Sequence, residues 1–174
     1  MPVVSDSTAL IWLSKVGKID LLKTLYGEVY IPEEVYQEVV VRGLGEGFSD
    51  ALVIKDSVDK GWVIVKKLDE EQAKRCRILI DHAKELHRGE AQAILIAQKE
   101  EAPLLMDESC GRAFAEAWGL KVHGTLYVIL RGLHERIISR EEATDTINTL
   151  VEKGFRIEPS LITWVIREIQ HYKA

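Results

Sequence analysis

The chain has 174 residues, and its 28 acidic and 23 basic side chains give a formal net charge of -5 at pH 7. This length suits one well-buried domain, and the negative charge argues against a histone-like protein that binds nucleic acid through charge alone. The apolar runs are too short to span a bilayer and the first residues do not resemble a secretion signal, so we expect a cytoplasmic protein without membrane partners.

The amino-terminal part is expected to alternate short strands with helices. Val3 and Val4 begin a strand that runs into Asp6 and Ser7, and either Ser7 or Thr8 is expected to cap the helix that follows. Further along the chain, the patterns predict strands over residues 29–31 and 62–67 and helices over residues 20–26, 32–41, 49–61 and 69–89.

The stretch from residue 88 to residue 120 predicts a helix, a strand and another helix, with acidic residues where they join. We expect Gly89 to end one helix and Glu90 to open the next. The apolar run over residues 104–106 suits a parallel strand that is covered on both faces. Because open α/β sheets bind ligands at the carboxyl ends of their strands, Asp107 lies where chemistry is expected.

Past this stretch, Ser109 is a predicted N-cap, residues 121–123 resemble a short strand, and residues 124–135 resemble a helix. Ser139 and Glu142 form a predicted capping box for the next helix, and a last helix is expected over residues 160–172. Short strands that alternate with longer helices predict an α/β protein, a three-layer α/β/α fold around a central, mainly parallel sheet.

Four acidic residues stand out by their positions: Asp6, Glu38, Glu90 and Asp107. Asp6 and Asp107 each follow a predicted strand, and the ends of parallel strands lie on one edge of a sheet, so these two carboxylates can approach each other. Carboxylates that close repel, and either a proton or a divalent cation relieves the repulsion. Mg²⁺ and Mn²⁺ prefer oxygen ligands of this kind.

Each of the other two acids also has a simpler interpretation. Glu38 taken alone is typical of a solvated helix face, and Glu90 near a helix N-terminus can simply complement the helix dipole.

Five segments in order resemble the PIN-domain superfamily, and among its members the archaeal and bacterial branch of VapC-like, toxin-related proteins. These segments are SDSTALIWL, IPEEVYQEV, GEAQAILIA, LLMDESCGR and GLKVHGTLYVIL. The resemblance covers roughly residues 3–133, and residues 134–174 resemble a C-terminal helical extension, so the expectation is a single PIN-like domain over residues 1–174.

The resemblance implies a small metal-dependent nuclease with a 5′-nuclease-like fold that cuts RNA. It implies that Asp6, Glu38, Glu90 and Asp107 hold Mg²⁺ or Mn²⁺, and it matches Ser7 to a small hydroxyl residue beside the first aspartate.

The chain departs from the family pattern at two acidic positions. Glu90 stands where the wider superfamily often has Asp, and Glu108 stands where a second Asp is common, so Glu108 is a ligand, a neighbour of the ligands or neither. Arg112 fits the branch and can meet a phosphate, although an exposed pair with Glu116 is an equal alternative.

The function expected from these features is metal-dependent hydrolysis of RNA phosphodiester bonds by the toxin of a toxin–antitoxin pair. An RNA-processing nuclease outside any such pair and a non-catalytic RNA or protein interaction module are the alternatives. A small antitoxin is expected to place a basic side chain among the carboxylates and to cover an apolar groove beside Trp12 or Trp164. A homodimer is expected through surplus apolar residues of the first two helices: Ile11, Trp12, Leu22 and Leu25.

Overall fold

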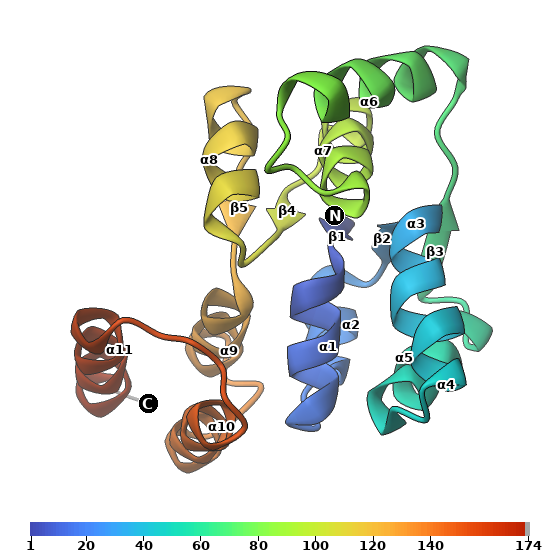
Figure 1. Cartoon of the computed structure of the whole chain (residues 1–174). Helices are drawn as coiled ribbons and strands as arrows, with labels where there is room; N and C mark the ends of the chain where they lie inside the picture. Colours follow the sequence, from blue (N-terminus) through green and yellow to red (C-terminus); the bar gives the residue numbers. More distant parts are fainter. Residues whose placement is uncertain (173–174) are drawn as a thin grey trace.

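Five parallel strands form one central sheet, in the spatial order β3-β2-β1-β4-β5. They are β1 (Val3–Ser5), β2 (Val29–Pro32), β3 (Val63–Lys66), β4 (Leu104–Leu105) and β5 (Val122–His123). The computed structural model describes residues 1–172, and Figure 1 shows helices on both faces of the sheet. The predicted three-layer α/β/α fold with a parallel sheet is therefore confirmed.

The helices follow the strands in the alternation that the sequence predicts. They are α1 (Ser7–Lys15), α2 (Asp20–Tyr26), α3 (Glu33–Tyr36), the π-helical segment η1 (Gln37–Arg42), α4 (Gly43–Gly45), α5 (Ser49–Asp59), α6 (Glu70–His82), α7 (Arg88–Glu100), α8 (Ser109–Ala117), α9 (Thr125–His134), α10 (Arg140–Glu152) and α11 (Pro159–His171). None of the helices within residues 1–172 combines the length and the apolar character needed to cross a membrane.

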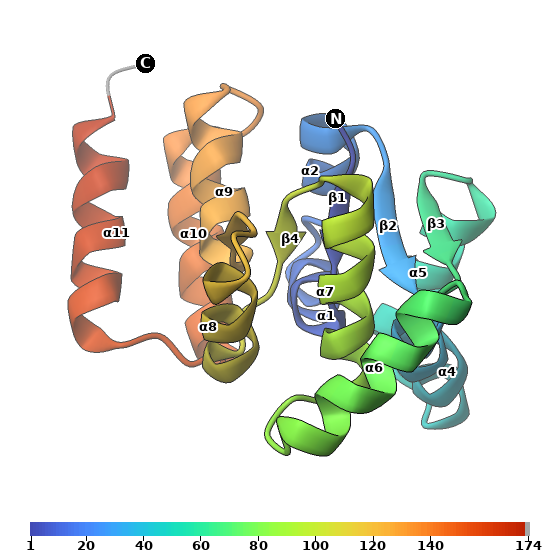
Figure 2. The same ribbon diagram turned by 90° about the horizontal axis from the view of Figure 1, so that it is seen from above.

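Two apolar cores lie on opposite faces of the sheet, because successive strand residues point to opposite faces. Val3 packs into the core beneath α1, α2, α5 and α9, whereas Val4 packs into the core beneath α6, α7 and α8. The last two helices belong to the first core, through Ile147 of α10 and Val165 of α11. Figure 2 shows α9, α10 and α11 side by side at one end of the molecule.

The order of the strands places a topological switch point between β1 and β4. From β1 the chain builds the sheet outward through β2 and β3, and it then returns to the other side of β1 to add β4 and β5. Ligands of open α/β sheets bind outside the carboxyl ends of the strands at such a point. Asp6 follows β1 and Asp107 lies two residues beyond β4, so both belong to this edge.

Two predicted helix boundaries around residue 89 are wrong. The expected long helix over residues 69–89 stops at His82, and α7 begins at Arg88, so Gly89 lies inside the first turn of α7 rather than between two helices. Gly89 is there because of packing. A Cβ atom at Gly89 would lie 3.3 Å from Cγ2 of Val35 in α3, so the two helices pack closely at this glycine.

Carboxylates replace the hydroxyl groups that were expected to cap two helices. Asp6, not Ser7 or Thr8, is the N-cap of α1. Glu108, not Ser109, is the N-cap of α8. An ionised oxygen is a stronger acceptor for the free N–H groups of a first turn than a hydroxyl oxygen, and it also complements the helix dipole.

The predicted apolar surplus on the first two helices is also wrong. Leu22 is fully buried, and Ile11, Trp12 and Leu25 are partly buried against the same core. The indole of Trp12 packs edge-to-face on the ring of Phe155, with 5.2 Å between the ring centroids. Helices α5 and α9 pack against α1, and α9 packs against α2, so none of the four residues is an exposed apolar side chain.

Candidate functional site

The candidate site lies where β1 and β4 end side by side. Ser5 is paired with Leu105 in the sheet, and the backbone N–H of Asp6 donates to the carbonyl of Leu105 over 3.0 Å. Because of this pairing, α1 and the β4–α8 connection begin at the same level along the strand direction. The two aspartates therefore leave the same edge of the sheet.

Asp6 is almost completely buried, with 2% of its surface exposed. Its Oδ1 atom accepts hydrogen bonds from the backbone N–H groups of Thr8 (2.9 Å) and Ala9 (3.4 Å). Burial, and after it the charge of Asp107, raises the pKa of Asp6 to about 8, against the opposing effect of these hydrogen bonds. Without a cation beside it, this carboxyl group therefore keeps a proton at neutral pH.

Asp107 is held by the first residue of α9. The backbone N–H of Thr125 donates to Oδ1 over 2.9 Å, and the Thr125 hydroxyl donates to Oδ2 over 2.6 Å. Burial raises the pKa of Asp107, although these hydrogen bonds and the charge of Arg112 act in the opposite direction. A Cβ atom at Gly124 would lie 2.6 Å from Oδ1 of Asp107, so only glycine leaves room for this arrangement.

Glu90 reaches the same edge from the first turn of α7. Its Oε2 atom accepts a hydrogen bond from the backbone N–H of His87 (2.9 Å), and the residue is buried. Burial is the main cause that raises the pKa of Glu90, and the charges of Glu108 and Glu38 add to it. Glu90 lies beside Gly111 of α8, where a Cβ atom would be in ordinary contact with Oε1 of Glu90 at 3.6 Å but would lie only 2.5 Å from Sδ of Met106.

Glu38 is the outermost of the four acids. It is exposed, and it lies in the π-helical segment η1, where a regular helix was predicted. Its Oε2 atom would lie 3.9 Å from a Cβ atom at Gly89, which places Glu38 beside the start of α7. Single-turn π-helical segments of this kind are frequent at functional sites.

Glu108 and Arg112 both face the Asp107 side of the site. Oε2 of Glu108 accepts from the backbone N–H of Gly111 (3.0 Å) as the cap of α8. Nη1 of Arg112 donates to the carbonyl of Met106 (3.2 Å), while Nη2 lies 3.7 Å from Oε1 of Glu116. The pair with Glu116 is present, and the guanidinium group is nevertheless beside Asp107.

Comparison with known families now bears on this geometry. A family model described as a PIN domain matches residues 2–171, which is nearly the whole chain. The chain belongs to the PIN-domain family. No curated protein matches the chain. PIN domains are generally nucleases, so the predicted superfamily and its nuclease fold are confirmed, whereas the VapC-like branch stays a prediction.

The side chains of this PIN domain fit a hard divalent cation by their chemistry. They supply only carboxylate oxygens, and the buried carboxyl group of Asp6 needs either a proton or a positive charge beside it. As these side chains stand, no three Asp, Glu, His or Cys residues within residues 1–172 converge on one point. The reason is visible in the hydrogen bonds, because backbone N–H groups hold Asp6, Glu90 and Glu108 toward their own helices. A shared cation requires these side chains to rotate toward one another.

Thr125 and Gly124 are site residues that sequence reasoning missed. They open α9 directly after β5, which neighbours β4 in the sheet. The rule that singled out Asp6 and Asp107, namely position after a strand at the functional edge, applies equally to the end of β5. Thr125 is completely buried, and both of its donors are used on Asp107. The position of Ser7, at the start of α1 beside Asp6, is as predicted, and its role stays a prediction.

A cleft of about 1020 Å³ is lined by residues of α1, α8, α9 and α11 and by Asp107, the one of the four candidate acids that lines it. Glu108, Arg112, Trp12 and Trp164 are also among its lining residues.

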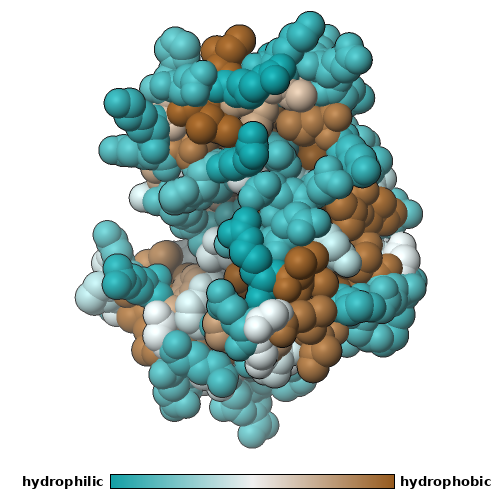
Figure 3. All heavy atoms as spheres, turned by 45° about the vertical axis from the view of Figure 1, so that its right-hand side comes forward, coloured by the Kyte–Doolittle hydropathy of each residue, from teal (hydrophilic) through white to brown (hydrophobic). Residues whose placement is uncertain are grey.

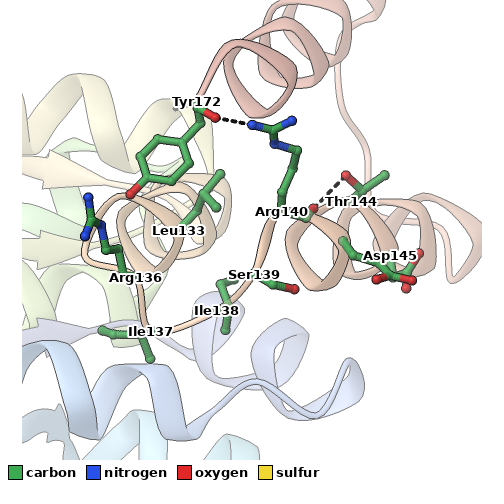
Figure 4. A pocket seen from close by; sticks show the side chains of 10 residues that line it. Leu133, Arg136, Ile137, Ile138, Ser139, Arg140, Thr144, Asp145 and Tyr172 are labelled. Atoms are coloured by element: carbon green, nitrogen blue, oxygen red, sulfur yellow. Dashed lines mark hydrogen bonds between the residues drawn. The ribbon is translucent and has the colours of Figure 1, made fainter. Parts of the chain in front are cut away.

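A second pocket, of about 730 Å³, lies between the end of α9, the start of α10 and Tyr172 (Figure 4). The Arg140 guanidinium donates to the backbone carbonyl of Tyr172, and the Tyr172 hydroxyl donates to the carbonyl of His134 over 3.2 Å. These contacts fasten Tyr172 to α9 and α10. None of the predicted site residues lines this pocket.

Proposed function

We propose that this PIN domain is a metal-dependent ribonuclease that hydrolyses phosphodiester bonds in RNA. The observation that carries the proposal is that the buried Asp6 and the partly buried Asp107 both lie at the switch point of the sheet. Burial raises the pKa of both carboxyl groups, and the charge of Asp107 raises the pKa of Asp6 further. Two acidic residues in such positions lower the stability of the folded protein, which argues against a purely structural role. A bound cation would offset their negative charge and would use both as ligands.

Asp6, Glu90 and Asp107 would hold Mg²⁺ or Mn²⁺, and Glu38 would be a further ligand or a neighbour that orients one. When bound, the ion supplies positive charge that offsets the negative charge developing on the phosphoryl group, and it activates a water molecule for in-line attack.

The residues of the chain divide the remaining work by position. Thr125 keeps Asp107 turned toward the edge of the sheet through two hydrogen bonds. Arg112 lines the cleft next to Asp107 and can donate to a phosphate oxygen. Ser7 and Glu108 lie beside Asp6 and Glu90, where they can contact a ligand or a water molecule. The mechanism needs no covalent intermediate with the protein.

Cleavage of RNA by matched aspartate variants tests this proposal. We expect Asp6→Asn and Asp107→Asn to abolish cleavage in Mn²⁺ or Mg²⁺, and we expect Glu38→Gln to cost about 10- to 100-fold. Asp69→Asn is the control, because Asp69 is also an aspartate N-cap but lies on the exposed start of α6. Cleavage by Asp6→Asn at the rate of the wild type would refute the proposal.

We further propose that the ribonuclease is the toxin of a toxin–antitoxin pair. The antitoxin would place a basic side chain among the carboxylates and would cover the cleft that both Trp12 and Trp164 line. Expression of the protein alone should arrest growth, and Asp107→Asn should relieve the arrest. If expression alone does not slow growth while the purified protein cleaves RNA, the alternative of an RNA-processing enzyme is favoured.

We propose in addition that the protein forms a homodimer and that residues 134–174 belong to one domain with the rest of the chain. For the domain, the support is that Ile147 and Val165 share a core with Val3. For the dimer, the surface must differ from the one predicted, since α1 and α2 are covered.

A further inference from the structure

The cleft that opens from Asp107 is continuous with the candidate site and is walled by different parts of the chain. Asp107, Arg112 of α8, Tyr127 of α9 and Trp164 of α11 all line it. Metal binding by the four carboxylates does not require the aromatic side chains that line this cleft.

Tyr127 is already half of an aromatic stack. Its ring lies parallel to the imidazole of His123, with 3.7 Å between the ring centroids and 8° between the ring planes. The Tyr127 side chain still has 39% of its surface exposed. A ring fixed in this way presents a flat aromatic surface in the cleft and loses little further freedom when a ligand stacks on it.

Trp164 faces the same space from α11. Half of it is exposed, at 51%. Leu161, one turn earlier in α11, is exposed as well and lines the same cleft. The edge-to-face pair of Trp12 and Phe155 also lines the cleft.

Charged side chains of both signs line the cleft together with these aromatic rings. The basic ones are Arg112 and Arg156, and the acidic ones are Asp107, Glu108, Glu116 and Glu158, of which Glu116 is paired with Arg112. Burial, and after it the charges of Arg112, Arg131 and Lys121, lowers the pKa of His123, which favours the neutral imidazole under Tyr127. A nucleotide suits this combination, because its base can stack on an exposed ring while its phosphates accept hydrogen bonds from the guanidinium groups.

We propose that this cleft is a subsite for an unpaired nucleotide of the RNA substrate, adjacent to the phosphate that is cut. The base stacks on Tyr127 and is covered by Trp164, while Arg112 and Arg156 contact the backbone on either side. This inference rests on the proposed ribonuclease function and makes it more specific. Bases in a duplex are stacked on one another and cannot enter, so the enzyme should require a single-stranded segment.

Binding of a short oligonucleotide separates the subsite from catalysis. The probe is a fluorescein-labelled single-stranded RNA of about ten nucleotides. Its affinity is measured by fluorescence anisotropy at a fixed Mg²⁺ concentration of about 5 mM. All proteins carry Asp6→Asn so that no RNA is cut. Tyr127→Ala and Trp164→Ala should each weaken binding about 5- to 150-fold, which is the usual effect of removing one base–aromatic stack.

Three comparisons make the result specific. Tyr127→Phe keeps the ring and should bind like the parent protein. Ile78→Ala removes an apolar side chain of α6 that is also exposed, at 58%, but lies outside the cleft, and it should have no effect. The duplex formed from the same RNA and its complement should bind at least about tenfold more weakly than the single strand.

The outcomes distinguish the subsite from the ribonuclease proposal. Unchanged affinity of Tyr127→Ala and Trp164→Ala would overturn the subsite even if the wild type cleaves RNA, and it would leave the cleft to a protein partner. Equal binding of duplex and single strand would overturn it too. Loss of binding in both variants supports the subsite, even if the wild type fails to cleave and the ribonuclease proposal falls.

Discussion

The hydroxyl of Thr125 and the carboxylate of Asp107 are joined by a hydrogen bond of 2.6 Å, and the backbone N–H of Thr125 donates to the other carboxylate oxygen over 2.9 Å. The two residues are 18 positions apart in the chain and belong to neighbouring strand ends. Both donors of one buried residue are therefore committed to one acidic side chain. This makes Thr125 a positioning residue for the candidate metal site.

We predict that Thr125→Val lowers metal-dependent RNA cleavage about 10- to 100-fold, as is usual when a group that orients a metal ligand is removed. The substitution keeps the volume and the β-branch but removes the hydroxyl donor. Thr125→Ser keeps the donor and should retain most of the activity. Calorimetric titration of Mn²⁺ should show weaker binding for Thr125→Val than for Thr125→Ser, and equal affinities would show that the hydroxyl does not orient Asp107.

We predict that Gly124→Ala damages the site through its Cβ atom rather than through its backbone. Gly124 has an extended backbone (φ -112°, ψ -178°) that any residue can adopt, but its Cβ atom would lie 2.6 Å from Oδ1 of Asp107. Gly45→Ala is a matched control, because a Cβ atom there would meet nothing within 4 Å. Metal-dependent cleavage should be lost in Gly124→Ala and kept in Gly45→Ala. Normal cleavage by both would mean that Asp107 moves without consequence.

We predict that Mn²⁺ or Mg²⁺ raises the melting temperature of the wild type and not that of Asp6→Asn. Ligand at about 100 times its Kd adds roughly 2.7 kcal/mol to the free energy of unfolding. For a domain of this size that corresponds to a rise of about 5–10 °C. Scanning calorimetry with metal and then with excess chelator measures it. Weak sites are filled at millimolar concentrations of metal, so an unchanged melting temperature at such concentrations would count against the site.

We predict that the metal-free protein loses stability as the pH rises toward 8. The pKa of Asp6 is about 8 in the folded protein against an ordinary value of 3.8, so the folded state holds a proton that the unfolded state releases. Stability is therefore fully present below pH 3.8, falls through the window up to about pH 8 and is level beyond it. The slope from this one group is about 1.4 kcal/mol per pH unit at most.

The control for this pH dependence is Asp6→Asn, which has no proton to release at that position. Its melting temperature, measured without metal in the same buffers, should fall less steeply than that of the wild type. Parallel curves for the two proteins would show that Asp6 is ionised in the folded state at neutral pH.

We predict a symmetric homodimer whose contact surface lies on η1, α4 and α5. Exposed apolar side chains recur along these elements. Figure 3 turns the right-hand side of Figure 1 toward the viewer and shows hydrophobic residues, in brown, in the lower half of the molecule. The exposed apolar side chains are Val41, Leu44, Phe48, Leu52 and Val53. Light scattering at micromolar protein should give the mass of two chains, and Leu52→Glu should give one. A monomer mass for the wild type in both low and moderate salt would overturn the prediction.

Local patterns were enough to predict the layers, the parallel sheet and the positions of Asp6 and Asp107. The residues of VVS and VYIP indicate buried strands by themselves, because β-branched side chains suit a pleated sheet that is covered on both faces. The rule that parallel strands end at one edge then brings together acids that are a hundred residues apart in the chain. The same patterns misplaced the start of α7. They treated Gly89 as a residue that ends a helix, whereas Gly89 lies in the first turn of α7 and packs against Val35 of α3, which is distant in the chain.

The sequence by itself therefore determined the family, the sheet and which carboxylates lie at the carboxyl edge of the sheet. Only the tertiary structure decided that Thr125 holds Asp107, that burial raises the pKa of Asp6, and that Trp12 packs on Phe155 whereas half of Trp164 is exposed. The physical reason is that secondary structure and strand order follow from side chains close together in the chain. Desolvation, the orientation of a carboxylate and the exposure of a ring instead depend on which distant elements pack around it.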